Sequence, residues 1–208
     1  IEQHRVTHTF LPPTLIYMLL QHEKLAVTRL DSLQCFWYGA APISAARLEE
    51  ALTKIGPVMA QLFGQTEAPM MISMMSPREH FQPDGSVARE RLASAGRPGP
   101  LVQVATMDSE GRLLPVGDTG EIVVRSSLVM MGYYKDSKAT EEAGRFGWHH
   151  TGDIGRVDAD GFLYIVDRAK DMIITGGFNV YSVDVEQALM QHLDVQDSGV
   201  IGLPDEKW

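Results

Sequence analysis

The stretch "HTGDIGRVDADGFLYIVDRAKDMIITGGFN", from His150 to Asn179, decides how this chain folds. Two runs of apolar residues flank Asp160 and Gly161, and an Asp-Gly pair in that setting is a strong β-hairpin signal. The charged segment "DRAKD" and a Gly-Gly pair follow the hairpin. Turns need glycine and surfaces need charge, so the many glycines and charged residues in this stretch have a purely structural explanation. The other explanation is that these side chains face one ligand, and the rest of the chain decides between the two.

Helices and short apolar strands alternate in the first part of the chain. "PPTLIYMLLQH" predicts a helix that begins at its proline pair, where a missing N–H costs little. "SLQCFWYGAAP" and "PVMAQLFGQTEA" predict buried strands that run into loops, and between them Ser44 caps the helix "AARLEEALTKIG". Alternation of strand and helix predicts the α/β class, with a helix-covered sheet over residues 1–93.

The pattern changes near Ser94, where strand-like runs are separated by turn signals such as Glu110-Gly111. Residues 94–167 are therefore expected to form a small antiparallel, β-barrel-like subdomain. From residue 168 onward "DMIIT" predicts a strand, "GGFN" a turn, "SVDVEQALMQHL" a helix capped by Ser182, and "SGVIGLP" a further strand. Residues 168–208 are expected to be the start of a small α+β domain, and both chain ends are interpreted as cuts through a larger protein.

The bulk composition excludes several classes of protein. The 208 residues are 44% hydrophobic and 22% charged, as in ordinary globular domains, and the net charge of −9 argues against a nucleic-acid partner. A single cysteine, Cys35, rules out a disulfide within the chain and favours the cytoplasm. Its apolar surroundings predict a buried, inert thiol. No apolar stretch approaches the ~20 residues of a membrane span.

Two loops after predicted strands hold the first candidate site residues. In "YGAAP" small residues let a flat ligand lie against the backbone, although a tight strand-to-helix turn explains them too. In "FGQTEA" Gly64 permits close approach, Thr66 offers a hydroxyl to phosphate, and Glu67 offers a hard oxygen to Mg²⁺. A loop that caps the next helix is the alternative.

Two further clusters come from the opening stretch. In "HTGD" a glycine lets the Asp153 carboxylate point outward, where it suits the two hydroxyls of a ribose, and an ordinary turn is the alternative. In "DRAKD" Arg168 is within reach of a ribose or phosphate, and a solvated linker is the alternative. His149 and His150 are adjacent and would face opposite ways in a strand, which disfavours a shared metal. The methionine-rich "PMMISMM" predicts core or tunnel wall rather than a metal site.

Taken in order, "YGAAP", "FGQTEA", "GEIVVRSSLVMMGYY", "HTGD" and "DRAKDMIITGGFNVYSVDVE" resemble the adenylate-forming superfamily. Its members include acyl- and aryl-CoA synthetases, peptide-synthetase adenylation domains and beetle luciferases. The resemblance covers nearly the whole chain and is most specific in the final third. There "IITGGFNVYSVDVE" looks most like the CoA-ligase branch.

The resemblance implies a role for each matching position. The resemblance implies that ten residues line the nucleotide: Gly39, Ala40, Ala41, Pro42, Phe63, Gly64, Thr66, Asp153, Ile165 and Arg168. Within that set Thr66 would hold the α-phosphate, Asp153 and Arg168 would grip the ribose, and Glu67 would bind Mg²⁺, so that Thr66 and Glu67 are the catalytic candidates. Lys170 matches the domain hinge, and Gly176 and Gly177 match the path of coenzyme A. The stretch from His150 to Asn179 would hold so many charges and glycines because it binds the nucleotide and then crosses the hinge.

The reaction so implied joins a carboxylic acid to ATP, giving acyl-AMP and pyrophosphate, and then passes the acyl group to the thiol of coenzyme A, as in fatty acid metabolism. The phosphate loop with its lysine would lie before Ile1 and the catalytic lysine after Trp208, so the chain by itself is expected to be inactive. Two alternatives remain: an acyl-AMP ligase or carrier-protein loading domain, and a non-enzymatic nucleotide-binding module. Intact Thr66, Glu67, Asp153 and Arg168 argue against the last. The acid is not specified, and an oligomer is possible.

Overall fold

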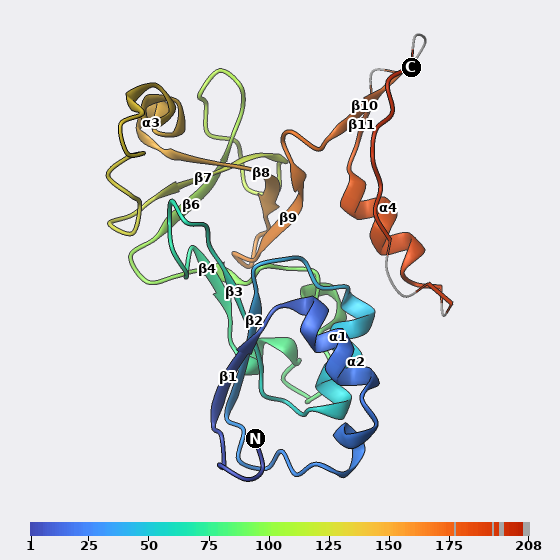
Figure 1. Ribbon diagram of the computed structural model, residues 1–208. Helices are drawn as coiled ribbons and strands as arrows, with labels where there is room; N and C mark the ends of the chain where they lie inside the picture. Colours follow the sequence, from blue (N-terminus) through green and yellow to red (C-terminus); the bar gives the residue numbers. More distant parts are fainter. Residues whose placement is uncertain (177, 193, 196–197, 206–208) are drawn as a thin grey trace. The chain divides into compact units, whose positions relative to one another are not determined.

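The computed structural model describes residues 1–205 apart from 177, 193 and 196–197 (Figure 1). Its contacts divide the chain into two compact units. The first unit is Ile1–Gly64 with Met70–Gly99, and the second is Gln65–Pro69 with Pro100–Trp208. The chain therefore leaves the first unit for a short segment, returns to it, and leaves it again after Gly99. The boundaries expected at residues 93 and 167 stay predictions.

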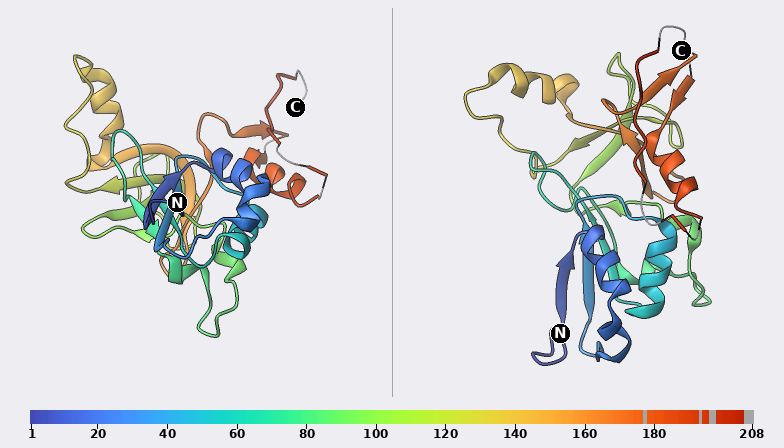
Figure 2. Two further views of the ribbon diagram at one scale, coloured as in Figure 1. Left: turned by 60° about the horizontal axis from the view of Figure 1, so that its bottom comes forward. Right: turned by 45° about the vertical axis from the view of Figure 1, so that its right-hand side comes forward.

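The first unit is a five-stranded sheet with two helices, which confirms the α/β class. The strands lie in the order β1-β2-β3-β4-β5, parallel among the first three and antiparallel at β4 and β5. Helices α1 and α2 pack against each other and lie on one face of this sheet (Figure 2). The elements are β1 (His8–Leu11), α1 (Pro13–Gln21), β2 (Cys35–Gly39), α2 (Ala45–Lys54), β3 (Met59–Phe63), β4 (Ser73–Met75) and β5 (Arg97–Pro98), with short 3-10 turns at Glu23–Val27, Pro77–His80 and Arg89–Arg91.

Both helices of the first unit begin where the sequence predicts. Pro12 is the N-cap of α1 and Pro13 its first residue. The Ser44 hydroxyl accepts a hydrogen bond from the Arg47 N–H at 3.3 Å, which satisfies one of the orphan donors of the first turn of α2. Each helix therefore starts at residues whose local chemistry suits a helix N-terminus.

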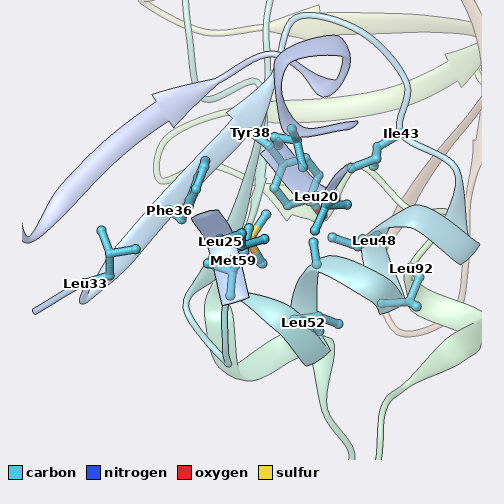
Figure 3. Close-up of a cluster of buried hydrophobic side chains, with 13 residues drawn as sticks. Leu20, Leu25, Leu33, Phe36, Tyr38, Ile43, Leu48, Leu52, Met59 and Leu92 are labelled. Carbon is cyan, nitrogen blue, oxygen red and sulfur yellow. The ribbon is translucent and has the colours of Figure 1, made fainter. Parts of the chain in front are cut away.

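A cluster of buried side chains joins these helices to the sheet (Figure 3). Phe36 from β2, Met59 from β3 and Leu48 from α2 are all fully buried. Burying one such side chain stabilises the fold by about 1.5–3 kcal/mol. Tyr38 is also fully buried in this cluster. Cys35 is buried as predicted.

The second unit holds a four-stranded antiparallel sheet in the order β6-β7-β8-β9. The antiparallel unit is thus confirmed, but the pairing of the described strands is open rather than barrel-like. Asp160 and Gly161 form the β8–β9 turn, where the Asp158 carboxylate accepts from the Phe162 N–H at 2.8 Å. The elements are β6 (Gln103–Met107), β7 (Gly120–Arg125), α3 (Ser137–Ala143), β8 (His149–Val157) and β9 (Leu163–Arg168), with a short turn at Arg145–Gly147.

The chain beyond Arg168 corrects three details of the sequence reading. It contains β10 (Ile173–Thr175), β11 (Phe178–Val180) and α4 (Ser182–Leu189). Half of the predicted "GGFN" turn is therefore strand. Ser182 is the first helical residue and not the cap, because its N–H and hydroxyl both donate to the Asp167 carboxylate, at 2.6 and 3.1 Å. The predicted strand "SGVIGLP" is wrong, since residues 198–204 have no ladder partner. Leu193, the last residue of the predicted helix, lies outside the described residues.

None of the helices in the described part of the chain is both long and apolar enough to cross a membrane.

Candidate functional site

The candidate site lies in the second unit, where the segment Gln65–Pro69 meets the start of β8. A backbone hydrogen bond from the Gln65 N–H to the Ala68 carbonyl, 3.1 Å long, closes this segment into a turn. The Met130 N–H donates to the Glu67 carbonyl at 2.7 Å. The segment is thus tied by backbone bonds as well as by its side chains, and it presents Gln65, Thr66 and Glu67 next to β8.

Asp153 and Arg168 are brought together by the hairpin. They are direct cross-strand partners in the β8–β9 register, and the Arg168 Nε lies 3.6 Å from Asp153 Oδ1. The Asp153 side chain is buried, whereas the Arg168 side chain is 61% exposed. Because Arg168 is so exposed, water screens this ion pair and it adds little to stability. The guanidinium is thus open to solvent beside a carboxylate that is buried.

The turn before Asp153 fixes where its carboxylate points. Gly152 has a φ of +71°, a left-handed conformation that glycine adopts without strain. The Gly152 N–H donates to Glu121 Oε1 at 3.2 Å, and the Asp153 N–H donates to the Thr151 hydroxyl at 3.1 Å. The glycine in "HTGD" therefore has a backbone reason that is independent of any ligand.

Burial raises the pKa of Asp153 above its usual value, and Arg168 and the amide of Gln65 offset only part of that rise. A buried carboxylate loses its water, so the ionised form becomes costlier. Such a group gains from any ligand donor that replaces the lost hydrogen bonds of water. The hydroxyls of a sugar are donors of that kind.

Glu67 has the opposite electrostatics. The Tyr133 hydroxyl donates to Glu67 Oε1 at 2.7 Å, and this bond is the largest cause that lowers the pKa of the carboxyl. Glu67 is therefore ionised at neutral pH, as a hard ligand for Mg²⁺ must be. Among the described residues no group of three or more His, Cys, Asp and Glu side chains is arranged for a metal. One carboxylate fits Mg²⁺ that is held mainly by phosphate oxygens and water.

Two partners of these carboxylates were missed from the sequence. Gln65 donates through Nε2 to the Thr151 carbonyl at 2.7 Å and to Asp153 Oδ2 at 3.1 Å, and its Oε1 lies 3.2 Å from His149 Nε2. Tyr133 holds Glu67. Both residues stand inside segments that the sequence singled out, "FGQTEA" and "GEIVVRSSLVMMGYY", but no spacing rule indicates what a glutamine or tyrosine will contact.

The adjacent histidines separate as the strand pattern predicts. His149 is directed to Gln65, whereas His150 Nδ1 lies 2.8 Å from Glu121 Oε2. Burial lowers the pKa of His149. Both imidazoles are thus occupied by separate hydrogen-bond partners.

The other predicted site residues are placed as follows. In the first unit, Gly39 ends β2, and a Cβ there would stand 2.3 Å from the Leu62 carbonyl oxygen, so the close approach of β3 requires glycine. Ala40, Ala41, Pro42 and Gly64 are exposed, and Phe63 ends β3 half-buried. In the second unit Thr66 is exposed, Ile165 is half-buried in β9, Lys170 is exposed just after β9, and Gly176 is exposed between β10 and β11. Gly177 lies outside the described residues.

The second unit thus brings together a buried carboxylate, an arginine and an ionised glutamate. Sequence comparison identifies the family. The chain belongs to the AMP-binding enzyme family, which matches residues 1–134.

Known relatives extend the match to the whole chain. The chain is 43% identical over 208 residues to the medium/long-chain-fatty-acid–CoA ligase FadD8 of Mycobacterium tuberculosis, covering 100% of this chain and 35% of that protein. The structure of the amide bond synthetase McbA from Marinactinospora thermotolerans superposes with a TM-score of 0.92 at 40% identity, covering 99% of this chain and 41% of that one. The o-succinylbenzoate CoA synthetase MenE of Bacillus subtilis, solved with the acyl-adenylate OSB-AMP, gives 0.84 at 33% identity, with 99% and 40% covered. The chain thus spans about two fifths of the length of these proteins.

Proposed function

We propose that this chain is the nucleotide-gripping part of an ATP-dependent carboxylic acid–CoA ligase. The observation that carries the proposal is the pair of Asp153 and Arg168, a buried carboxylate beside an exposed guanidinium, in one unit with the ionised Glu67. The match to a fatty-acid–CoA ligase and to a CoA synthetase bound to an acyl-adenylate supports it.

In this proposal the buried carboxylate of Asp153 accepts hydrogen bonds from the ribose hydroxyls, and Arg168 closes over the same sugar. Thr66, which is exposed beside Glu67, donates to the α-phosphate. Glu67 would hold Mg²⁺, which would supply positive charge beside the phosphates. Ile165 is proposed to lie beside the nucleotide. For Gly39–Pro42 and Phe63–Gly64, in the first unit, a role at the nucleotide stays a prediction.

The second half-reaction would use residues beyond β9. Lys170 is proposed as the hinge about which the C-terminal part turns, and Gly176 and Gly177 as small residues along the path of coenzyme A. Lys170 stands in a turn directly after the ribose pair, so a rotation there would leave the grip on the nucleotide intact.

The relatives differ in acid and in acceptor. Their names point to fatty acids for FadD8, to o-succinylbenzoate for MenE and to amide bond formation for McbA. A second candidate function is therefore transfer of the acyl group to an amine, favoured by the TM-score of 0.92 with McbA. Both functions share the adenylation step. We place the enzyme in the cytoplasm, where its single cysteine stays reduced.

The test is pyrophosphate release by the intact enzyme from Mg²⁺–ATP with a panel of fatty and aromatic acids. Thioester formation with coenzyme A and amide formation with a simple amine are then measured separately. We expect acid-dependent pyrophosphate release that falls at least tenfold in Asp153→Ala and is unchanged in Glu141→Ala, a control at an exposed carboxylate of α3. Absence of acid-dependent release across the panel, with folded protein, would contradict the proposal.

A further inference from the structure

The amide of Gln65 links the two halves of the candidate site. Glu67, the proposed metal ligand, is two positions further along the same turn, and Asp153, the proposed ribose ligand, is on β8. Gln65 contacts Asp153 directly at 3.1 Å and reaches His149 at 3.2 Å. Glu67 in turn acts electrostatically on His149. Gln65 is the only side chain that the described hydrogen bonds connect to both His149 and Asp153.

The orientation of this amide follows from its partners. The Thr151 carbonyl only accepts hydrogen bonds, and the ionised Asp153 carboxylate only accepts them too. The Gln65 nitrogen must therefore face both, and each of its two N–H groups is used. The Gln65 oxygen then faces His149, so His149 Nε2 is the donor in that bond. All of the amide's polar atoms are engaged, and no other rotation of the amide satisfies this set.

We propose that Gln65 is a positioning residue for Asp153: its amide nitrogen anchors Oδ2 of the carboxylate, so that Oδ1 is held ready for the ribose hydroxyls and Arg168. This inference rests on the proposed function and adds to it a residue that helps the site select nucleotides with ribose hydroxyls. A short aspartate side chain has two rotatable bonds, and a half-buried hydrogen-bond anchor on one oxygen restricts both. The orientation entropy is then lost on folding rather than on ligand binding.

The Thr151 bond gives the amide its own fixed point. At 2.7 Å it is the shorter of the two Nε2 contacts, and it goes to the backbone of β8 two positions before Asp153. Gln65 is therefore held by the same strand that carries Asp153. A side chain that reached Asp153 from a free loop would lack this coupling.

The test uses AMP and 2′,3′-dideoxy-AMP as probes, because the ratio of their dissociation constants isolates the ribose hydroxyls. Calorimetric titration is done on the intact enzyme and on Gln65→Met, which keeps the length of the side chain and removes its polar atoms. Gln103→Met makes the same change at an exposed position of β6 and serves as the matched control. Asp153→Ala sets the limit at which no ribose preference remains.

We expect Gln65→Met to weaken AMP binding by about threefold to tenfold, the range for one ordinary hydrogen bond. The dissociation constant of the dideoxy analogue should change by less than about twofold, so the ratio of the two dissociation constants, which measures the preference for AMP, should fall. In an Asp153→Ala background the same substitution should add nothing, as a double-mutant cycle measures. Gln103→Met should match the parent enzyme throughout.

Three results overturn the inference. An unchanged AMP preference in Gln65→Met excludes the positioning role, and so does an equal loss for both nucleotides, which indicates general damage to the fold. Additive losses in the double variant mean that Gln65 acts elsewhere than through Asp153. Failure of the parent enzyme to bind AMP is a different outcome, because it removes the proposed function itself and the inference with it.

Discussion

At the scale of single residues, Asp153 combines a stability cost with a binding role. Burial raises its pKa above the value of an unfolded aspartate, so the folded state binds more protons in the window between the two pKa values. Stability therefore falls as pH rises through that window, so the ionised form of Asp153 is the one that costs stability. A group kept at such a cost is typical of a ligand-binding site.

Asp153→Asn should separate these two effects. The variant removes the buried charge, and its amide oxygen can still accept from Gln65, so the free energy of unfolding at pH 7 should be unchanged or higher. AMP affinity should drop by about 10- to 100-fold, because a hydrogen bond to a charged group is worth roughly 1.5–3 kcal/mol. Urea denaturation and calorimetry measure the two quantities. Equal AMP affinity in the variant and its parent would refute the ribose role.

Glu67→Gln should change the metal requirement. The variant keeps an acceptor for the Tyr133 hydroxyl but loses the charge that Mg²⁺ prefers. The Mg²⁺ concentration for half-maximal pyrophosphate release should rise severalfold, while the KM for the acid changes less. A titration of pyrophosphate release against Mg²⁺, at saturating ATP, gives both numbers. The reverse pattern would remove Glu67 from the metal site.

At the scale of elements, the hairpin was predictable and the helix after it was only partly so. An Asp-Gly pair between apolar runs specifies a turn locally, so β8 and β9 follow from their own residues. The start of α4 depends on Asp167, which is distant in sequence from Ser182 and binds its N–H and hydroxyl. The same limit applies to Gln65 and Tyr133, whose contacts were set by folding rather than by spacing.

Another element is fixed by a buried histidine. In the first unit the Tyr38 hydroxyl and His80 Nε2 lie 2.9 Å apart, and His80 Nδ1 lies 3.0 Å from the Ser76 carbonyl. That carbonyl only accepts, so Nδ1 carries the proton and the neutral Nε2 accepts from Tyr38. The pair joins the turn Pro77–His80 to β2, and burial lowers the pKa of His80.

Acid should therefore weaken the first unit. Below the pKa of His80 in the unfolded chain, ~6.5, the unfolded state binds a proton and the folded state does not. The contribution of the neutral His80 to stability is therefore complete above that pH and is lost below it. Between pH 7.5 and 5.5 the urea midpoint should fall, and less steeply in His80→Gln. Fluorescence of Trp37, in β2, follows the unfolding. His8→Gln, at an exposed histidine of β1, is the control and should keep the parent slope.

At the scale of the whole molecule, the proposed hinge permits a sharp test. Backbone N–H groups of Ala169, Asp171 and Met172 donate hydrogen bonds of 2.8–3.0 Å. Among the hydrogen bonds of the described residues, none uses the N–H of Lys170. Proline can therefore replace Lys170 without breaking a described backbone bond, although it fixes φ near −65° and restricts Ala169.

In the intact enzyme, Lys170→Pro should retain most single-turnover pyrophosphate release. Thioester formation from supplied acyl-adenylate should fall by orders of magnitude, because the rotation between half-reactions is blocked. Lys170→Ala is the control, because it removes the same side chain without restricting the backbone, and it should support both steps. Equal losses in both steps would indicate misfolding, and no loss in either would place the hinge elsewhere.

The residues 1–208 by themselves are expected to make no acyl-CoA, because the relatives they match are far longer. A thioester assay on the purified chain, against a preparation that lacks it, checks this. Any turnover above that background would show that the cationic elements expected outside the chain are dispensable.

The segment Gln65–Pro69 has a consequence for how the protein is made. It belongs to the second unit, yet it leaves the ribosome before Met70–Gly99 completes the first and long before β8 exists. At ~5–20 residues per second, the turn that carries Glu67 waits several seconds or more for the strand it will bind. During that wait Gln65 lacks the partners on β8 that hold its amide, which are Thr151, Asp153 and His149. Rare codons between Gly99 and β8 would lengthen the wait.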